Sequence, residues 1–247
     1  MPGSVTLVTG ASADIGLSLI RRLLLSEPGS LILAHHHQGG ERLAALQAEM
    51  GPNCIQSIQA DFSQNDAARR MAQHILNTVG PPNKFVHLPA LKLVYERFPA
   101  SDWTRFQQDL NVQLLSAVSL LQQFLPRMSK LQHGRVVFLT STVTRGLPPK
   151  YMAPYTVAKY AQLGLVKALA AEYASTNVTV NAVSPTMVET RFLDEVPSVA
   201  TRMSASANPK GRNATPEDII GAIEFLLSER AGFITGIEMV IAGGAAC

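Results

Sequence analysis

Tyr155 and Lys159 lie four positions apart in the sequence and could together perform acid–base chemistry. The apolar spacing of residues 154–175 predicts a helix, so both side chains project from one of its faces. A tyrosine has a reference pKa of about 10 and is a poor acid–base catalyst at neutral pH unless a nearby cation favours its phenolate. Lys159 is placed to supply that cation. Ser141, at the end of a strand predicted over 135–141, could donate a hydrogen bond to a substrate carbonyl oxygen as negative charge develops there.

On its own, this pair would also fit a solvent-exposed helix, but a glycine turn near the start of the chain favours the chemical interpretation. Residues 9–16 read TGASADIG between a predicted strand and a predicted helix. Gly10 lets the chain leave the strand in a tight turn, and Gly16 lets the helix pack closely on the strand. The exposed N–H groups and the dipole at the start of the helix favour a pyrophosphate.

These residues need a scaffold, and short β-type runs alternate with helical patterns along the chain, which indicates βαβ units and a parallel sheet. Strands are predicted at residues 4–9, 30–34, 55–60, 85–88, 135–141, 178–183 and 238–241. Helices are predicted at residues 15–26, 41–50, 64–79, 109–130, 154–175 and 216–227. Near-continuous Val, Ile and Leu strands suit a sheet that is covered on both faces. The sequence therefore predicts an α/β doubly wound fold.

One long stretch, from residue 186 to about 215, has no regular pattern. A loop of that length in a compact domain is usually functional and often closes over an active site. We therefore expect a substrate loop at about 186–214. Residues 191–212 are rich in Ser, Ala and Met without a fixed charge pattern, which suits an apolar or extended ligand.

The composition and the charge of the chain exclude several classes of protein. The chain has 247 residues, 47% of them hydrophobic, which is enough for one core, and we expect a single domain over residues 1–247. The net charge of +3 is scattered, whereas a nucleic-acid binder would show a concentrated basic stripe. Cys54 and Cys247 lack metal-ligand spacing and read as reduced thiols. No apolar run is long enough to span a membrane, so we expect a soluble, cytoplasmic protein without a metal, membrane or nucleic-acid partner.

Motifs in order along the chain resemble those of the short-chain dehydrogenase/reductase family. TGASADIG at 9–16 is similar to the family's TGxxxGxG, and YTVAK at 155–159 to its YxxxK. NAVSPTMVET at 181–190 is similar to N-x-[VI]-S-P-G-x-x-x-T, and ITGIEMVIAGG at 234–244 to ITGxxxxVDGG. The resemblance covers essentially the whole chain. It implies a single Rossmann-type parallel sheet of about seven strands with helices on both faces, and a homodimer or homotetramer built on the two long helices.

The resemblance also implies catalytic roles for individual residues. Tyr155 would be the general acid, and Lys159 would lower its pKa and bind the cofactor ribose. Ser141 would orient the substrate carbonyl. Thr142 competes for that role because Ser141 lies one position farther from Tyr155 than is usual.

For the cofactor, the resemblance implies contacts near the ends of the strands. Thr190 would meet the nicotinamide carboxamide, Val188 would touch the same ring, and Asp61 would meet the adenine. The expected cofactor-binding residues are Gly10, Ser12, Asp14, Ile15, Gly16, His36, His37, Asp61, Ala90, Tyr155, Lys159, Pro185, Val188 and Thr190.

Several positions depart from the family pattern. Asp14 stands in place of a glycine; its carboxylate could repel phosphates, but an Asp at a helix start is also a favourable partner for exposed amides. Residues 87–90 read HLPA where the family has NNAG beneath the cofactor. The family's catalytic Asn, which holds a water in the proton relay to the lysine, falls on Gln113, or on Asn111 if the helix is offset.

The residues after the second predicted strand bear on the choice of cofactor. An acidic residue there binds the ribose 2′-hydroxyl of NAD, but this chain reads AHHHQ at 34–38, with no carboxylate until Glu41. His36 and His37 would tolerate a 2′-phosphate, although the run also fits a solvated loop. A metal site is not expected because neighbours on an extended chain point apart. The sequence predicts NADP(H) in preference to NAD(H).

Taken together, these residues predict an NADPH-dependent carbonyl reductase. The pattern is closest to the 3-oxoacyl-[acyl-carrier protein] reductases of the family, so a β-ketoacyl thioester, free or tethered to a carrier protein, is the leading substrate. Arg127, Lys130 and Arg135 are candidate docking residues for an acidic carrier protein and fit ordinary surface charge equally well. Changes such as Asp14 and Gln113 would also fit a weakly active or inactive subunit paired with an active homologue. An alcohol or sugar dehydrogenase that uses the same residues in reverse is the second alternative.

Overall fold

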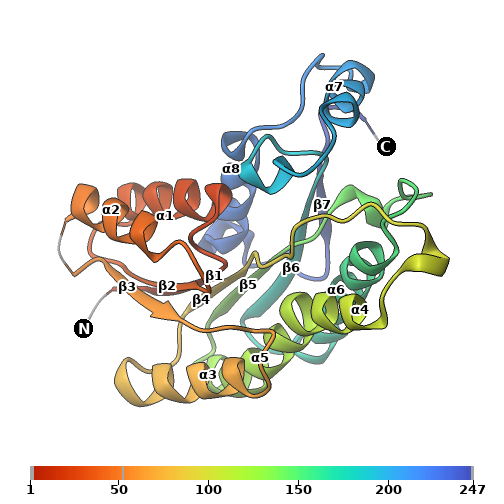
Figure 1. Cartoon of the computed structure of the whole chain (residues 1–247). Helices are drawn as coiled ribbons and strands as arrows, with labels where there is room; N and C mark the ends of the chain where they lie inside the picture. Colours follow the sequence, from red (N-terminus) through yellow and green to blue (C-terminus); the bar gives the residue numbers. More distant parts are fainter. Residues whose placement is uncertain (1–2, 52, 246–247) are drawn as a thin grey trace.

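The centre of the protein is a seven-stranded parallel sheet, seen in a computed structural model that describes residues 3–51 and 53–245 (Figure 1). The strands are β1 (Val5–Thr9), β2 (Leu31–His36), β3 (Ile55–Gln59), β4 (Lys84–His87), β5 (Gly134–Leu139), β6 (Val178–Pro185) and β7 (Glu238–Ile241). They lie in the order β3-β2-β1-β4-β5-β6-β7, which is that of a doubly wound sheet. The predicted α/β class and Rossmann-type sheet are confirmed.

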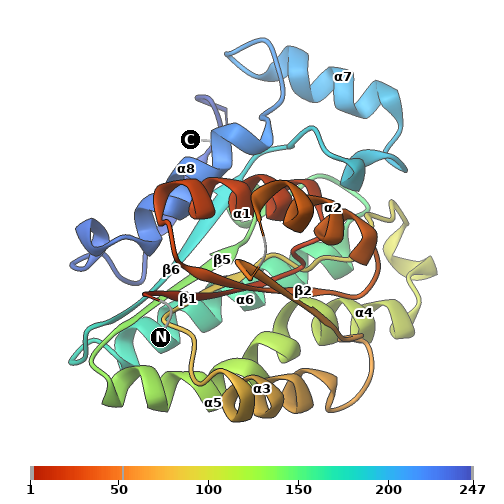
Figure 2. The same cartoon turned by 90° about the vertical axis from the view of Figure 1, so that its left-hand side faces the viewer.

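Helices cover both faces of the sheet (Figures 1 and 2). One layer contains α1 (Asp14–Ser26), α2 (Gly40–Met50) and α8 (Pro216–Leu227). The other contains α3 (Ala67–Thr78), α4 (Trp103–Leu110), α5 (Ser116–Lys130) and α6 (Ala153–Glu172). Each layer buries its own apolar core against the sheet, with Leu19, Ile32 and Ile219 on the first face and Phe85, Phe124 and Phe138 on the second. Burial of both faces explains the near-continuous apolar strands.

The structure corrects two predicted helices. The helix predicted from residue 64 begins at Ala67, because the Asp61 carboxylate accepts a hydrogen bond from the N–H of Ser63 at 2.9 Å and Asp66 has a φ of 61°. The helix predicted at 109–130 is preceded by α4 and interrupted by a π-helical turn, Asn111–Leu115. Such turns often occur at functional sites.

The long irregular stretch contains one helix that the sequence pattern did not indicate. This helix, α7 (Ser198–Ala207), projects from the body of the molecule (Figures 1 and 2). None of its residues is buried, so it has no apolar stripe that a periodicity argument could detect.

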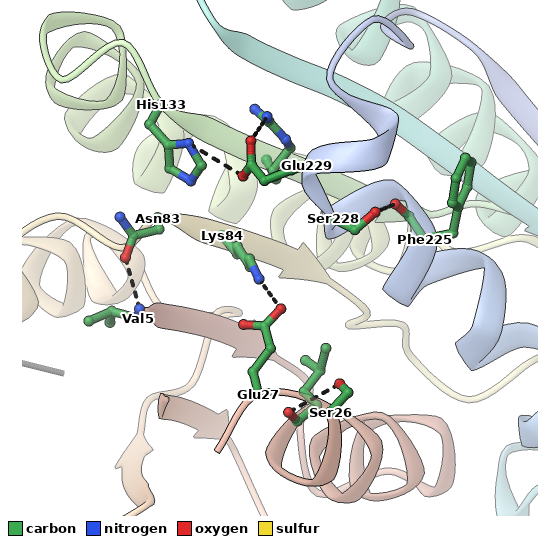
Figure 3. Close-up of polar contacts among 11 residues, drawn as sticks. Val5, Ser26, Glu27, Asn83, Lys84, His133, Phe225, Ser228 and Glu229 are labelled. Atoms are coloured by element: carbon green, nitrogen blue, oxygen red, sulfur yellow. Dashed lines mark hydrogen bonds and ion pairs between the residues drawn. The ribbon is translucent and has the colours of Figure 1, made fainter. Parts of the chain in front are cut away.

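At the amino edge of the sheet, charged side chains lie close to the starts of the strands (Figure 3). Lys84 of β4 is buried and pairs with Glu27 at the end of α1. Arg135 of β5 is 1% exposed, and its guanidinium donates to the Glu229 carboxylate at 2.9 Å. His133 Nδ1 lies 3.7 Å from the same carboxylate.

The position of Arg135 corrects the expectation that it forms a docking surface with Arg127 and Lys130. Arg135 is buried at the start of β5, and Arg127 and Lys130 lie in the last turn of α5, which leads into that strand. All three therefore lie towards the amino edge, away from the carboxyl ends of the strands, where a doubly wound sheet binds its ligands.

Candidate active site

The predicted site residues gather at the carboxyl edge of the sheet, around the point where strand order reverses between β1 and β4 (Figure 1). The glycine turn follows β1, and Ser141 follows β5. Tyr155 and Lys159 come from the first two turns of α6, which packs beside β6. In open α/β sheets, this crevice is the usual place for a ligand.

The turn between β1 and α1 has room only for glycine at its two ends. Gly10 has a φ of 70°, and a Cβ there would lie 3.0 Å from the nitrogen of Pro89. A Cβ at Gly16 would lie 2.5 Å from the carbonyl oxygen of Ala11, so α1 approaches β1 too closely for any side chain. Between them, Ser12 and Ile15 are partly exposed. This geometry fits a dinucleotide, whose pyrophosphate would be held by the N–H groups that open α1.

Asp14 opens α1, and two arginines hold its carboxylate. Arg42 Nη2 donates to it at 2.6 Å, the main-chain N–H of Arg191 donates to it at 2.7 Å, and Arg191 Nε lies 3.5 Å away. Burial acts to raise the pKa of Asp14, but the hydrogen bonds from Arg191 and Arg42 outweigh it and keep that pKa below its usual value. Two guanidinium groups around one ionised carboxylate leave a positive balance, which suits an anionic group.

The histidines at the end of β2 are mostly not open to a ligand. His35 is buried, and burial lowers its pKa to about 4. His36 is buried beneath α2, where a Cβ at Gly40 would lie 2.7 Å from its ring. His37 is exposed, with Nε2 3.7 Å from Asp61. The expectation of an open imidazole surface for a 2′-phosphate is therefore wrong for His36, because its ring packs under the start of α2.

Arg42, which the sequence argument did not identify, brings a positive charge to the turn before α1. Its Nη1 donates to the carbonyl oxygen of Ser12 at 2.7 Å, and the Ser12 hydroxyl donates to the carbonyl oxygen of Gln38 at 2.7 Å. Arg42 thus ties the loop after β2 to the turn before α1. The sequence signal for it was an arginine in the first turn of the second helix.

Ser141, Tyr155 and Lys159 come together as predicted. Ser141 caps the 3₁₀ turn Thr142–Thr144 and hydrogen-bonds to Tyr155. Lys159 is 2% exposed, and its Nζ lies 5.5 Å from the centre of the Tyr155 ring. Thr142, the competing candidate, begins the turn that Ser141 caps.

Burial dominates the protonation of this pair. It raises the pKa of Tyr155 to about 12. The hydrogen bond with Ser141 acts to lower that pKa, and repulsion from Asp109 adds to the rise. Burial also lowers the pKa of Lys159 to about 7, although the negative charge of Asp109 acts to raise it. The expectation that Lys159 lowers the pKa of Tyr155 is wrong in this arrangement, because burial disfavours the charged form of each. A neutral phenol is the form that can donate a proton.

Gln113 lies in the π-helical turn, but its side chain is not directed at Lys159. Its Nε2 donates to the carboxylate of Asp109 at 2.7 Å, and its Oε1 has no hydrogen-bond partner in the described part of the chain. Its main-chain carbonyl accepts from Gln162 Nε2 at 2.7 Å and faces His87 Nε2 at 2.9 Å. Gln113 therefore reaches Lys159 through its backbone and Gln162, not through its own amide.

Three residues around Lys159 were missed by sequence reasoning, in addition to the arginines that hold Asp14. Gln162 lies one helical turn beyond Lys159, so its spacing could have revealed it. Asp109, which is buried and paired with Arg105 at 2.8 Å, lies one turn before Gln113. His87 was noted only as a departure from the family pattern.

The substrate loop places apolar side chains beside Tyr155. Leu93, Met152 and Val196 form a small buried cluster, and Phe192 and Tyr155 pack against it. The ring centroids of Tyr155 and Phe192 are 6.3 Å apart. The phenol therefore lies in an apolar enclosure built partly from the loop predicted at 186–214.

The remaining predicted cofactor residues lie at or just beyond the carboxyl ends of the strands. Pro185 ends β6, and Val188 forms a β-bridge with Ala214. The Thr190 hydroxyl donates to the carbonyl oxygen of Val188 at 3.3 Å. Asp61 lies just after β3. Ala90 lies just after β4.

Residues 3–51 and 53–245 contain no group of three or more His, Cys, Asp and Glu side chains that could hold a metal ion. No helix among them is both long and apolar enough to cross a membrane.

Comparison with known proteins matches the chain over nearly its whole length. Residues 10–246 match the family described as "Enoyl-(Acyl carrier protein) reductase". The chain is 30% identical to acetoacetyl-CoA reductase of Allochromatium vinosum over 245 residues, 97% of each protein. It is 28% identical to 3-oxoacyl-[acyl-carrier-protein] reductase FabG of Thermotoga maritima, over 99% of this chain and 98% of the relative.

The fold also matches solved structures. ElxO, solved with NADP bound, superposes with a TM-score of 0.86 at 24% identity, over 98% of each chain. This likeness supports the sheet order and the helix layers described above.

Proposed function

The chain belongs to the short-chain dehydrogenase/reductase family of NAD(P)-dependent oxidoreductases that act on carbonyl and hydroxyl groups, and we propose that it is an NADPH-dependent ketoreductase for β-ketoacyl thioesters. The observation that carries the proposal is the meeting of Ser141, Tyr155 and Lys159 in an apolar enclosure beside the glycine turn. Its Tyr155 is a partly buried, neutral phenol, which suits proton donation to a ketone oxygen.

In this mechanism, the chain positions the ketone and delivers a proton. NADPH supplies the hydride when bound, with its phosphates at the turn that opens α1 and its nicotinamide near Thr190. Ser141 donates a hydrogen bond to the ketone oxygen, and Tyr155 gives that oxygen its phenolic proton. Lys159 in its ammonium form stabilises the phenolate that remains. The apolar cluster around Tyr155 keeps water from the reacting groups.

Several features support an acyl thioester as the substrate. The walls beside Tyr155 are apolar, as an acyl chain requires. A hollow of about 540 Å³ just before the start of α6 is lined by Arg97 and Lys150 together with Glu96, Phe98 and Tyr151. Two cations beside one carboxylate leave a positive balance, which suits the phosphate of a thioester carrier, or an acidic carrier protein, better than the cations at the opposite edge. The names of the relatives from A. vinosum and T. maritima point to the same class.

We also propose a cytoplasmic homodimer or homotetramer. Large apolar side chains are exposed on the layer that contains α4, α5 and α6, and a second copy of the chain would cover them. They are Trp103, Leu115, Val157 and Tyr160.

The decisive experiment measures NADPH consumption with acetoacetyl-CoA and repeats it with NADH. Turnover with a higher kcat/KM for NADPH supports the proposal, and equal values for the two cofactors would remove the stated preference. Faster oxidation of a sugar or secondary alcohol with NADP⁺ would favour a dehydrogenase. An absence of turnover together with an absence of NADPH binding would favour an inactive subunit, the reading to which Asp14 and Gln113 lend some support.

Asp14 is expected to weaken NADPH binding. Asp14→Asn keeps the shape of the side chain and removes a negative charge from the phosphate turn while Arg42 and Arg191 remain. We expect the Kd for NADPH to fall about tenfold, about 1.4 kcal/mol, in a fluorescence titration. Glu224→Gln, which breaks a comparable pair with Arg22 elsewhere on the surface, is the control and leaves the Kd unchanged. Weaker binding in Asp14→Asn would show that the carboxylate acts mainly to hold the two arginines.

The rate of ketone reduction is expected to fall as the pH rises. Lys159 has a pKa of about 7, so it loses its proton, and its ability to stabilise the phenolate, as the pH passes through that value. Tyr155, with a pKa of about 12, stays protonated throughout. The measurement is kcat at saturating NADPH and ketone between about pH 5 and 9. A flat profile across this range would contradict the role of Lys159 as the titrating group.

A further inference from the structure

Beneath Lys159 lies a buried polar network that the mechanism above does not use. Lys159 Nζ donates to the carbonyl oxygen of Leu139 at 2.8 Å and to Gln162 Oε1 at 3.1 Å. Gln162 Nε2 in turn donates to the main-chain carbonyl of Gln113 at 2.7 Å. Gln162 and Gln113 are fully buried. A buried amide with a partner at both ends is held in a single orientation.

The Gln113 carbonyl has a second donor on its other side. His87 Nε2 lies 2.9 Å from it, and Thr9 Oγ1 lies 2.9 Å from His87 Nδ1. Burial lowers the pKa of His87 to about 3, so the ring is neutral. Because a carbonyl cannot donate, Nε2 carries the hydrogen and Nδ1 accepts from Thr9.

This arrangement leaves no place for a water at the Gln113 carbonyl. A carbonyl oxygen has two lone pairs, and Gln162 and His87 occupy both. The resemblance to the family implied a relay water held by the residue at position 113. In this chain, the Gln162 side chain makes the connection between Gln113 and Lys159.

We propose that Gln162 is a positioning residue, which fixes the Lys159 ammonium beneath Tyr155 in place of the relay water. The proposal rests on the ketoreductase function above. An amide oxygen only accepts and an amide nitrogen only donates, so Gln162 orients Lys159 without carrying its proton onward. Lys159 is then the end of the relay. It gives a proton to the Tyr155 phenolate after each reduction and regains one from solvent.

The charges around Lys159 indicate what loss of Gln162 does. Tyr155 lies on the same helix and is neutral. From α4, the Asp109 carboxylate favours the ammonium, although it is shared with Arg105 and Gln113. From β4, His87 is neutral. Gln162 Oε1 therefore adds an acceptor that stabilises the ammonium, and its removal favours the free amine.

The test follows the Lys159 amine by lysine NMR in the protein without cofactor, with Lys159→Arg to assign its signal. Gln162→Met keeps the volume and removes the acceptor, and we expect it to lower the pKa of Lys159 by about one unit, tenfold in the protonation constant. Gln162→Glu adds a negative charge and raises it by about one unit. Gln122→Met, an exposed glutamine on α5, serves as the matched control and leaves it unchanged.

A second readout is the pH profile of kcat, whose alkaline limb shifts in the same direction as the Lys159 titration in each variant. Unchanged titrations and profiles in folded Gln162→Met and Gln162→Glu would overturn the proposal and leave Gln162 a packing residue. If the wild-type chain reduced no ketone, the proposed function would fail, whereas the NMR titration would still decide whether Gln162 sets the protonation of Lys159.

Discussion

Tyr155→Phe lowers kcat for ketone reduction by roughly 10²–10⁴-fold, the usual contribution of a positioned general acid. The substitution removes the phenolic hydroxyl and keeps the ring that packs near Phe192. Since burial keeps Tyr155 protonated with a pKa of about 12, the hydroxyl is a proton donor throughout the working pH range. The Kd for NADPH is expected to change much less than kcat, because the turn before α1 that would hold the phosphates is untouched.

The matched control is Tyr160→Phe on the same helix. Tyr160 is 44% exposed, and its hydroxyl makes one long hydrogen bond, 3.4 Å, to the carbonyl oxygen of Gly146. It should keep wild-type kcat and KM. Steady-state rates with saturating NADPH decide the matter: a Tyr155→Phe variant as fast as Tyr160→Phe would remove Tyr155 from the mechanism.

Arg135→Ala is expected to destabilise the protein by about 3 kcal/mol. The Arg135 guanidinium donates to the carbonyl oxygens of Gly134 and Asn177, each at 2.9 Å, and so ties the start of β5 to the residue before β6. Alanine leaves these carbonyls without that donor and opens a cavity among buried groups. The measurement is the free energy of unfolding from a urea titration.

Two controls separate the buried contacts of Arg135 from its ion pair. Glu229 is 69% exposed, so solvent screens its charge, and Glu229→Gln should cost less than about 1 kcal/mol. Arg127→Ala removes an exposed arginine of α5 and should cost still less. If Glu229→Gln proved as costly as Arg135→Ala, the ion pair, not the backbone contacts, would be the source of the stability.

The sequence predicted the fold well because a sheet that is buried on both faces needs mostly apolar strands, such as β1 and β5. The strand predicted at 238–241 and the helix predicted at 216–227 have the observed bounds. The helix predicted at 109–130 was wrong in one respect. Its π-helical turn accompanies a contact between Asp109 and Gln113, and a periodicity argument does not see side-chain partners.

For the candidate site, the sequence could identify residues but not their surroundings. Tyr155 and Lys159 followed from spacing and from motif order. The partners of Asp14 could not be predicted, because Arg42 and Arg191 lie 28 and 177 positions away and meet it only in the folded chain. Nor does the sequence show which of two adjacent histidines is buried. His36 was therefore expected at the ligand surface, whereas it lies beneath α2.

The place of β1 between β2 and β4 has a consequence for the order of folding. Thr6 of β1 pairs with Lys84 of β4, and Gly10 rests against Pro89, so these contacts close a loop of nearly eighty residues. A ribosome that adds about 5–20 residues per second needs roughly 4–16 s to make the intervening chain. During that interval, β1 and β2 emerge with an unpaired strand edge. Until β4 leaves the ribosome, this edge of β1 is therefore open to pairing with another chain.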